Sequence, residues 1–276
     1  MDGHFRAFTF VDRITAVEPG RQIRGRYTIP AGVAEFPPSL VAEAIGQLAA
    51  WAAMAFLDFA SRPVAGLAGR VQVHGGALPG QTLELAATLD EVGEDAVSYG
   101  GTAHADGRLL MQLEHCVGPM VPLVDFDDPA ALRERFALLC GAGAMPGGFP
   151  GLGPLPLELG EGEPGRTARA DFTVPAAAPW FCDHFPRKPV FPGSLLLHVN
   201  LQLVAALAAE LAPGRWNLRE VTDVKLRAFM PPGERLHLQA RLTVLAGDTA
   251  QLVVETRLRK RLIGGARVAL TTEGER

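Results

Sequence analysis

A histidine in a proline-rich loop is the part of this sequence best suited to chemistry. The loop, residues 184–193, reads HFPRKPVFPG and is followed at once by an apolar segment that starts near Ser194. Its prolines each hold φ at about −65°, which stiffens the loop. If the apolar segment is a helix, its first backbone N–H groups, including that of Gly193, are free to polarise a carbonyl or to hold an anion. A histidine such as His184, held rigidly beside these donors, indicates acid–base chemistry next to a carbonyl.

Part of this pattern occurs a second time. Residues 36–47 (FPPSLVAEAIGQ) repeat residues 191–202 (FPGSLLLHVNLQ) position for position. The first copy carries an acid, Glu43, and Gln47 follows it one helical turn later on the same face. The second copy has His198 where the first has the acid. The first copy, in turn, has no histidine loop before it.

Offsets between matching landmarks support a duplicated module. The segment 18–21 (EPGR) recurs at 163–166, an offset of 163 − 18 = 145, whereas Phe36 matches Phe191, an offset of 191 − 36 = 155. The second copy therefore holds 155 − 145 = 10 additional residues between these landmarks, and they include the histidine loop. Two copies of one module predict two domains rather than one large one.

The predicted domains are residues 1–124 and 155–276, with a connecting segment at 125–154. Asp127-Asp128-Pro129 opens a short predicted helix that ends near Leu139, because proline suits a first helical turn. Residues 141–153 are rich in glycine and proline and are predicted to be a linker. Each domain should contain a long apolar helix, about 39–59 and 194–211, and strands. The expected strand segments include 83–87, 97–103, 108–117, 236–240, 251–259 and 267–272.

The histidine loop and the helix after it resemble the active-site motif of the β-hydroxyacyl-acyl-carrier-protein dehydratases, a hotdog-fold family. That motif reads His-Phe-Pro, two residues, Pro-Val-x-Pro-Gly, and then a helix with an acid and, four residues later, a glutamine. Residues 10–14 (FVDRI) are also similar to the opening of those enzymes. This chain departs from the motif twice: His198 occupies the acidic position, 198 − 184 = 14 residues after the histidine, and Asp183 stands where the family usually has glycine.

The resemblance implies an α+β fold built as a double hotdog. Each half would be an antiparallel sheet wrapped round its long central helix, and the two sheets are expected to be continuous. In such dehydratase dimers the histidine comes from one subunit and the acid from the other. A fused pair would then keep one composite site, made of His184 and Glu43. The second site would need a histidine loop in the first half and an acid at position 198, and it has neither.

The resemblance also implies the reaction. His184 would remove the Cα proton of a 3-hydroxyacyl thioester, Glu43 would protonate the departing hydroxyl, and the Gly193 N–H would polarise the thioester carbonyl. The product would be a trans-2-enoyl thioester, and the reverse hydration would use the same groups. Supporting roles are expected for the residues around these groups: Gln47, Phe185 and Pro192. The substrate would be carried on the phosphopantetheine of an acyl carrier protein or of coenzyme A, with no other cofactor and no metal.

Less specific interpretations remain open. The loop could be a surface turn that contains a histidine, although the whole ten-residue pattern argues against this. Glu43 on its own could be a helix-start carboxylate stabilised by the helix dipole, and His198 is expected to be a buried or interface histidine. Two other functions compete: a hotdog acyl thioesterase that uses Glu43, which would not need the loop, and a non-catalytic hotdog that binds acyl chains or a synthase partner.

Composition sets broader limits. The 276 residues carry a net charge of −4 and are 48% hydrophobic, so neither a basic field for nucleic acid nor an acidic tail is present. The three cysteines show no paired or metal-ligand spacing, which favours reduced thiols. No signal peptide is expected from residues 1–6, and the apolar stretch 40–57 is expected to be a core helix rather than a membrane span, because it contains Glu43 and Gln47. We therefore expect a cytoplasmic protein that is a pseudo-dimer within one chain, with a further homodimer left open.

Overall fold

The computed structural model describes residues 4–211 and 215–272; the first three residues of the stretch from which no signal peptide was expected lie outside this range. The first half of the chain forms seven strands and one long helix. They are β1 (Arg13–Glu18), β2 (Gln22–Thr28), α1 (Pro38–Phe56), β3 (Ser61–Pro63), β4 (Leu67–Val73), β5 (Thr82–Val92), β6 (Ala96–Ala105) and β7 (Arg108–Pro122).

The second half repeats this order after a short helical connection. The connection contains the 3-10 helix η1 (Leu123–Asp125) and α2 (Pro129–Cys140). The second half is built from β8 (Glu158–Gly160), β9 (Thr167–Thr173), η2 (Pro179–Cys182), α3 (Gly193–Ala208), β10 (Trp216–Leu226), β11 (Arg235–Ala246), β12 (Thr249–Leu258) and β13 (Arg261–Thr272). The 3-10 helix η2 leads directly into the histidine loop, and it belongs to the insertion that distinguishes the second copy.

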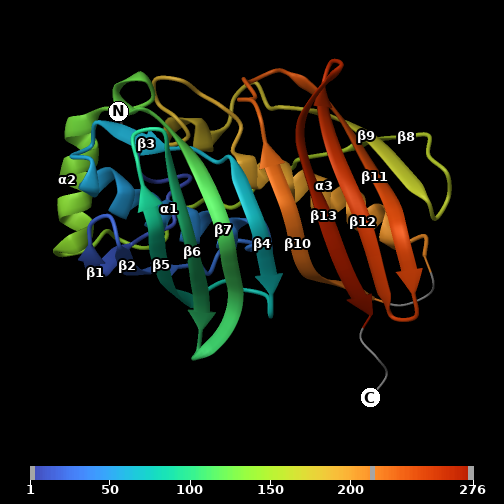
Figure 1. The fold of residues 1–276 in the computed structure, drawn as a ribbon, viewed down its shortest axis with the longest axis horizontal. Coiled ribbons are helices and arrows are strands. Elements are labelled where there is room, and N and C mark those ends of the chain that lie inside the picture. Colours follow the sequence, from blue (N-terminus) through green and yellow to red (C-terminus); the bar gives the residue numbers. More distant parts are fainter. Residues whose placement is uncertain (1–3, 212–214, 273–276) are drawn as a thin grey trace.

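One antiparallel sheet runs through both halves (Figure 1). Within the described residues it is 13-stranded, in the order β1-β2-β5-β6-β7-β4-β10-β13-β12-β11-β9-β8, with β3 paired to β7. Apart from β3, which has no counterpart among the described residues of the second half, the order is the same from either end, since each other strand of one half has its counterpart at the same place in the other. The halves join where β4 pairs with β10, and Val71 lies opposite Val221 in this seam. The predicted double hotdog with a continuous sheet is therefore confirmed.

The two long helices lie on the same face of the sheet and pack against each other (Figure 1). α1 is long and apolar enough to cross a membrane, but 61% of its most apolar window is buried in the protein, as expected for the core helix of a hotdog. The sheet comes so close to it that a Cβ on Gly101 would lie 2.5 Å from Ile45 Cγ2. Both helices end about three residues earlier than the sequence pattern predicted, at Phe56 and Ala208.

The connecting segment packs on the first half instead of hanging free. α2 begins where the sequence predicted, and the Asp128 side chain accepts a hydrogen bond from the Ala130 N–H as its N-cap. Within the predicted linker, Phe149 is only 3% exposed and its ring meets those of Phe10 and Phe36 edge-on. The part of the linker up to Phe149 thus contributes to the core of the first half.

Candidate active site

The histidine loop is held by backbone hydrogen bonds that orient the His184 ring. The His184 N–H donates to the Trp180 carbonyl at 2.8 Å, and the Val190 N–H donates back to the His184 carbonyl at 3.1 Å. The ring Nδ1 lies 3.1 Å from the Val190 carbonyl oxygen. A carbonyl can only accept, so Nδ1 carries the proton in this contact. Nε2 is consequently the nitrogen left to take part in proton transfer.

The loop belongs to the second half but docks on β3 of the first half and on the connecting segment. Phe185, which is buried, stacks on the His184 ring with centroids 4.1 Å apart and meets Phe126 edge-on. The guanidinium of Arg62, on β3, lies 3.9 Å from the centroid of the Phe185 ring. The Arg187 N–H donates to the carbonyl of Phe126 at 3.0 Å. These contacts explain why a phenylalanine follows the histidine: its ring forms the interface between loop and first half.

The acid, Glu43, lies on α1 and is held by the glutamine one turn later. Gln47 Nε2 donates to Glu43 Oε1 at 2.9 Å and to the Phe8 carbonyl at 3.0 Å. The Gln47 carbonyl oxygen accepts the Phe10 N–H at 2.8 Å. All three contacts are compatible with one amide orientation, because the amide nitrogen donates twice and the oxygen accepts once. Gln47 therefore fixes both the Glu43 carboxylate and the chain segment that covers it.

Two neighbouring cavities meet at Glu43. One, of about 110 Å³, is lined by Glu43 and His184 together with Gln47 and Arg62. The other, of about 170 Å³, is lined by Glu43 and by Gly193 at the start of α3, and it continues between the two long helices. The structure thus brings an acid of the first half to a histidine and a helix N-terminus of the second half.

Burial sets the protonation state of the histidine. Removal of the His184 ring from bulk water lowers its pKa below the ordinary value, and the positive charge of Arg62 lowers it further. The Glu43 carboxylate and the Val190 carbonyl act in the opposite direction but do not reverse the shift. The net direction keeps the imidazole neutral near pH 7, which is the form that can accept a proton.

Gly193 is the first residue of α3, and Pro192 is its N-cap. An N–H in the first turn of a helix has no acceptor within that helix, so the Gly193 N–H can be offered to a ligand. There is little space for a side chain here, since a Cβ on Gly193 would lie 2.8 Å from Leu226 Cδ2 and 3.2 Å from Ala65 Cβ. The lack of space thus favours glycine at this position, and any residue except proline would supply the free amide.

Comparison with known proteins identifies the family of the chain. The family model ApeI-like, described as ApeI dehydratase, matches residues 161–259. The dehydratase FabZ of Roseiflexus sp. (strain RS-1), a 3-hydroxyacyl-acyl-carrier-protein dehydratase, is 30% identical over 125 residues, which are 41% of this chain and 82% of the relative. The chain belongs to this hotdog dehydratase family. The FabZ of Rickettsia rickettsii (strain Sheila Smith) is 30% identical over 82 residues, 28% of this chain, and the match spans 57% of that relative's length.

Solved structures extend the likeness to the whole chain. A candidate oleoyl thioesterase from Lactobacillus plantarum has a TM-score of 0.62 at 9% identity and covers 93% of this chain and 98% of its own. A hotdog-fold protein of unknown function from Alicyclobacillus acidocaldarius has a TM-score of 0.55 at 13% identity and covers 98% of each chain. At these identities the likeness supports the fold alone. A dehydratase-family chain is here folded in the double arrangement seen in both structures.

The start of each long helix shares a cavity with the middle of the other helix, and we call each of these two places a crossing. The composite site is at one crossing, and its counterpart is at the other. Pro37 and Pro38, at the start of α1, line a cavity together with His198 and Gln202 of α3. His198 is buried, and its Nε2 lies 3.2 Å from the Gln202 amide nitrogen, which can only donate to it. Pro38 occupies the position that Gly193 holds at the composite site, and a proline has no N–H to offer. The counterpart has therefore lost the carbonyl-polarising donor as well as the acid and the histidine loop.

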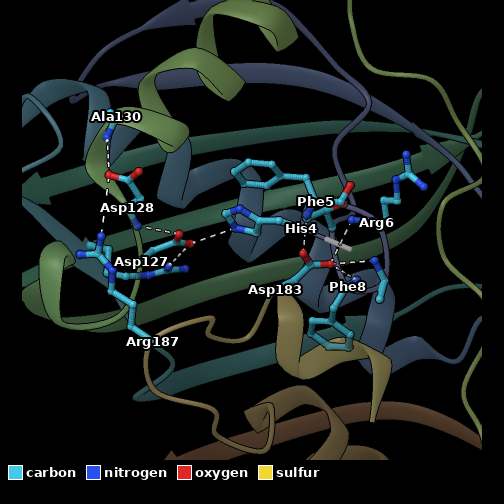
Figure 2. A network of polar contacts seen from close by, with 12 residues as sticks. His4, Phe5, Arg6, Phe8, Asp127, Asp128, Ala130, Asp183 and Arg187 are labelled. Carbon is cyan, nitrogen blue, oxygen red and sulfur yellow. Dashed lines mark hydrogen bonds and ion pairs between the residues drawn. The ribbon is translucent and has the colours of Figure 1, made fainter. Parts of the chain in front are cut away.

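Two residues near the site were not among the predicted site residues. Asp183, the departure from the family motif, is buried and accepts hydrogen bonds from consecutive N–H groups of the N-terminal segment (Figure 2). Arg62 lines the cavity shared by Glu43 and His184, and its Nη1 lies 3.6 Å from the buried carboxylate of Asp127. Arg62 belongs to a three-residue strand outside any motif. The sequence shows that Asp183 departs from the motif, but it does not show which N–H groups the Asp183 carboxylate binds.

Proposed function

We propose that this protein dehydrates 3-hydroxyacyl thioesters to trans-2-enoyl thioesters at one composite site between its two halves. The observation that carries the proposal is the shared cavity, lined by Glu43 of the first half and His184 of the second. The family supports the reaction class, and the match to the histidine loop and helix start supports the residues.

The proposed reaction requires one base, one acid and one carbonyl-polarising group. Nε2 of His184 removes the Cα proton, and the electron pair moves toward the thioester carbonyl, whose growing negative charge is stabilised by the Gly193 N–H. The Cβ–O bond then breaks while Glu43, in its protonated form, gives its proton to the departing hydroxyl, which leaves as water. A proton returned from His184 to Glu43 restores the starting state. These groups account for every proton, so the proposed reaction uses no cofactor.

The second part of the proposal concerns what is bound. We propose that the acyl chain occupies the cavity between α1 and α3, because that cavity starts at Glu43 and Gly193 and has mostly apolar walls that include Leu113, Leu196 and Val224. The thioester would arrive on the phosphopantetheine of an acyl carrier protein. The cytoplasm is the proposed location, in keeping with the free thiols of Cys116, Cys140 and Cys182.

The likeness to a candidate thioesterase makes hydrolysis the second activity to test. The purified chain should be given a 3-hydroxyacyl thioester on carrier protein, the same acyl group on coenzyme A, and a saturated acyl thioester on carrier protein. Enoyl thioester formed from the first substrate, without thiol release from the third, supports the proposal. Thiol release from the saturated substrate without enoyl formation would identify a thioesterase. Binding of acyl thioesters without turnover would identify a non-catalytic hotdog.

A further inference from the structure

The carboxylate of Asp183 holds four consecutive residues of the N-terminal segment. Its Oδ1 accepts the Phe5 N–H, and its Oδ2 accepts the N–H groups of Arg6 at 3.1 Å, Ala7 at 2.7 Å and Phe8 at 2.7 Å. Asp183 directly precedes His184 in the chain and is 8% exposed. Hydrogen bonds to an ionised acceptor are stronger than neutral ones. One buried carboxylate therefore fixes the path of residues 5–8.

The same segment touches the proposed base. The ring of Phe8 is buried and meets the His184 ring edge-on, with centroids 5.7 Å apart. Phe5, Phe8 and Thr9 line the cavity that Glu43 and His184 share. The segment is thus one wall of the site, and its position limits where the imidazole can lie.

The segment also reaches the proposed acid. Gln47 donates to the Phe8 carbonyl at 3.0 Å and accepts the Phe10 N–H at 2.8 Å, and its amide nitrogen also donates to Glu43 at 2.9 Å. Hydrogen bonds and the backbone of residues 5–10 therefore connect Asp183, beside the base, to Gln47 and the acid. The two ends of this connection belong to different halves of the molecule, since Asp183 lies in the second half and Gln47 on α1 of the first.

We infer that Asp183 is a positioning residue, which ties the histidine loop to the acid-bearing helix through the N-terminal segment and so sets the geometry between His184 and Glu43. Glycine, which the family motif usually has at this position, could make none of these side-chain contacts. The inference rests on the proposed dehydratase reaction for its catalytic consequence, but the tie itself can be measured without any substrate. Asp183 does not touch the reacting atoms and acts only through the segment.

Hydrogen exchange of the backbone amides tests the tie directly. Asp183→Asn keeps the size of the side chain but loses the charge and part of its accepting capacity, so the amides of residues 5–8 should exchange about 10-fold faster or more. The Phe10 amide, which is bonded to Gln47, should also exchange faster. Gln47→Leu should in turn loosen the amides of residues 5–8. Asp171→Asn, on an exposed part of β9 where Asp171 bonds Arg235, is the matched control and should leave all of these amides unchanged.

Kinetics test the catalytic consequence in the same variants. Asp183→Asn should lower kcat for 3-hydroxyacyl thioester dehydration by roughly 10- to 100-fold with KM within about 3-fold, because misplacing the reacting groups affects the chemical step. The double variant with Gln47→Leu should lose little more than the worse single variant, because Asp183 reaches the acid only through the segment that Gln47 holds. If Asp183→Asn fails to fold, Asp183→Glu, which keeps the charge but displaces it, should show the same faster exchange to a smaller degree.

The outcomes separate the inference from the proposed function. Unchanged exchange of residues 5–8 in Asp183→Asn, or in Asp183→Glu if only that variant folds, would overturn the tie whatever the activity. Faster exchange with unchanged kcat, or losses that multiply in the double variant, would overturn the positioning role. If the wild-type chain dehydrates nothing, the proposed function fails, and the reciprocal loosening between Asp183 and Gln47 still decides whether the two halves are tied through this segment.

Discussion

The two crossings of α1 and α3 are built from equivalent helices but carry different functional groups. At one crossing, Glu43 lines one cavity together with Gly193, and it lines a second cavity together with Gln47 and with His184 of the histidine loop. At the other, His198 faces Pro38, and there is no second loop in the sequence. Three separate contributors are thus present together at one crossing and missing together at the other.

This difference shows how a duplicated module can keep one site. In a symmetric dimer, each crossing must supply every group, so a substitution would damage both sites at once. In a fused chain, each position is free to change on its own. Pro38 suits the first turn of α1, because proline at N1 costs no intrahelical hydrogen bond, and His198 pairs with Gln202 inside the core. The second crossing therefore has Pro38 and His198 in structural positions, whereas the proposed acid, base and backbone donor all lie at the first.

The strongest challenge to a composite site is to separate the halves. Residues 1–149 and 150–276 expressed alone should each give no dehydration above background, because one fragment holds Glu43 and the other His184 and Gly193. Phe149 stays with the first fragment, since its ring is buried against Phe10 and Phe36. Co-expression should restore activity, as the seam between β4 and β10 and the helix contact remain intact. Full activity from the second fragment alone would rule out the cross-half site.

Single substitutions at the composite site should have the next largest effect. His184→Ala and Glu43→Gln should each lower kcat by roughly 10²- to 10⁴-fold, the range for loss of a positioned acid or base. His198→Gln is the matched control at the other crossing and should stay within about 3-fold of wild type. Circular dichroism and melting temperature should show that the variants are folded. Activity near the wild-type value in His184→Ala or Glu43→Gln would contradict the proposed roles.

Replacing Gly193 by the residue found at the other crossing should isolate the backbone donor. Gly193→Pro removes the N–H and is expected to lower kcat by about 10²- to 10³-fold, as for loss of one oxyanion donor. Gly193→Ala adds a Cβ close to Leu226 and Ala65 but keeps the N–H, so it measures the steric part of the change. If both variants lose the same activity, crowding rather than the amide is responsible.

The pH dependence should reveal the base of the active crossing and not the histidine of the other. His184 must be neutral to accept a proton, so the rate falls as pH drops through its pKa. Because burial lowers that pKa, the acidic limb of kcat/KM is expected below about pH 6.5, the ordinary value for histidine. Burial lowers the pKa of His198 too, but His198→Gln should leave the limb where it is. An acidic limb above pH 6.5 would contradict the assignment of His184.

The smallest effect is expected when an acid is restored at the second crossing. His198→Glu restores an acid there, but Pro38 still offers no N–H and no histidine loop precedes it. We therefore expect no increase in turnover and no rescue when His198→Glu is combined with Glu43→Gln. Rescue would show that the site is assembled within the second half alone.

Much of the fold and of the candidate site could be predicted from the sequence, because the signals are local. Proline restricts φ in the loop 184–193, apolar residues with helical spacing mark α1 and α3, and the matching copies at 36–47 and 191–202 identify the duplication. The sequence also shows that the first copy holds the acid, Glu43, and the second holds the histidine, His184. Only the helix ends were placed too late, since the apolar pattern continues past the residues that are still helical.

The contacts between distant segments required the tertiary structure. No spacing in the sequence indicates that Asp183 meets the amides of residues 5–8, or that Arg62 stacks on Phe185, because these partners are separated by more than 100 residues. The resemblance gives only the expectation that residues of the two halves share a site. The structure shows that Glu43 lines a cavity with Gly193, and that His198 lines another with Pro38. Local backbone preferences depend on neighbouring residues and can be recognised in sequence, whereas a buried charge acquires its partners only when the whole chain has packed around it.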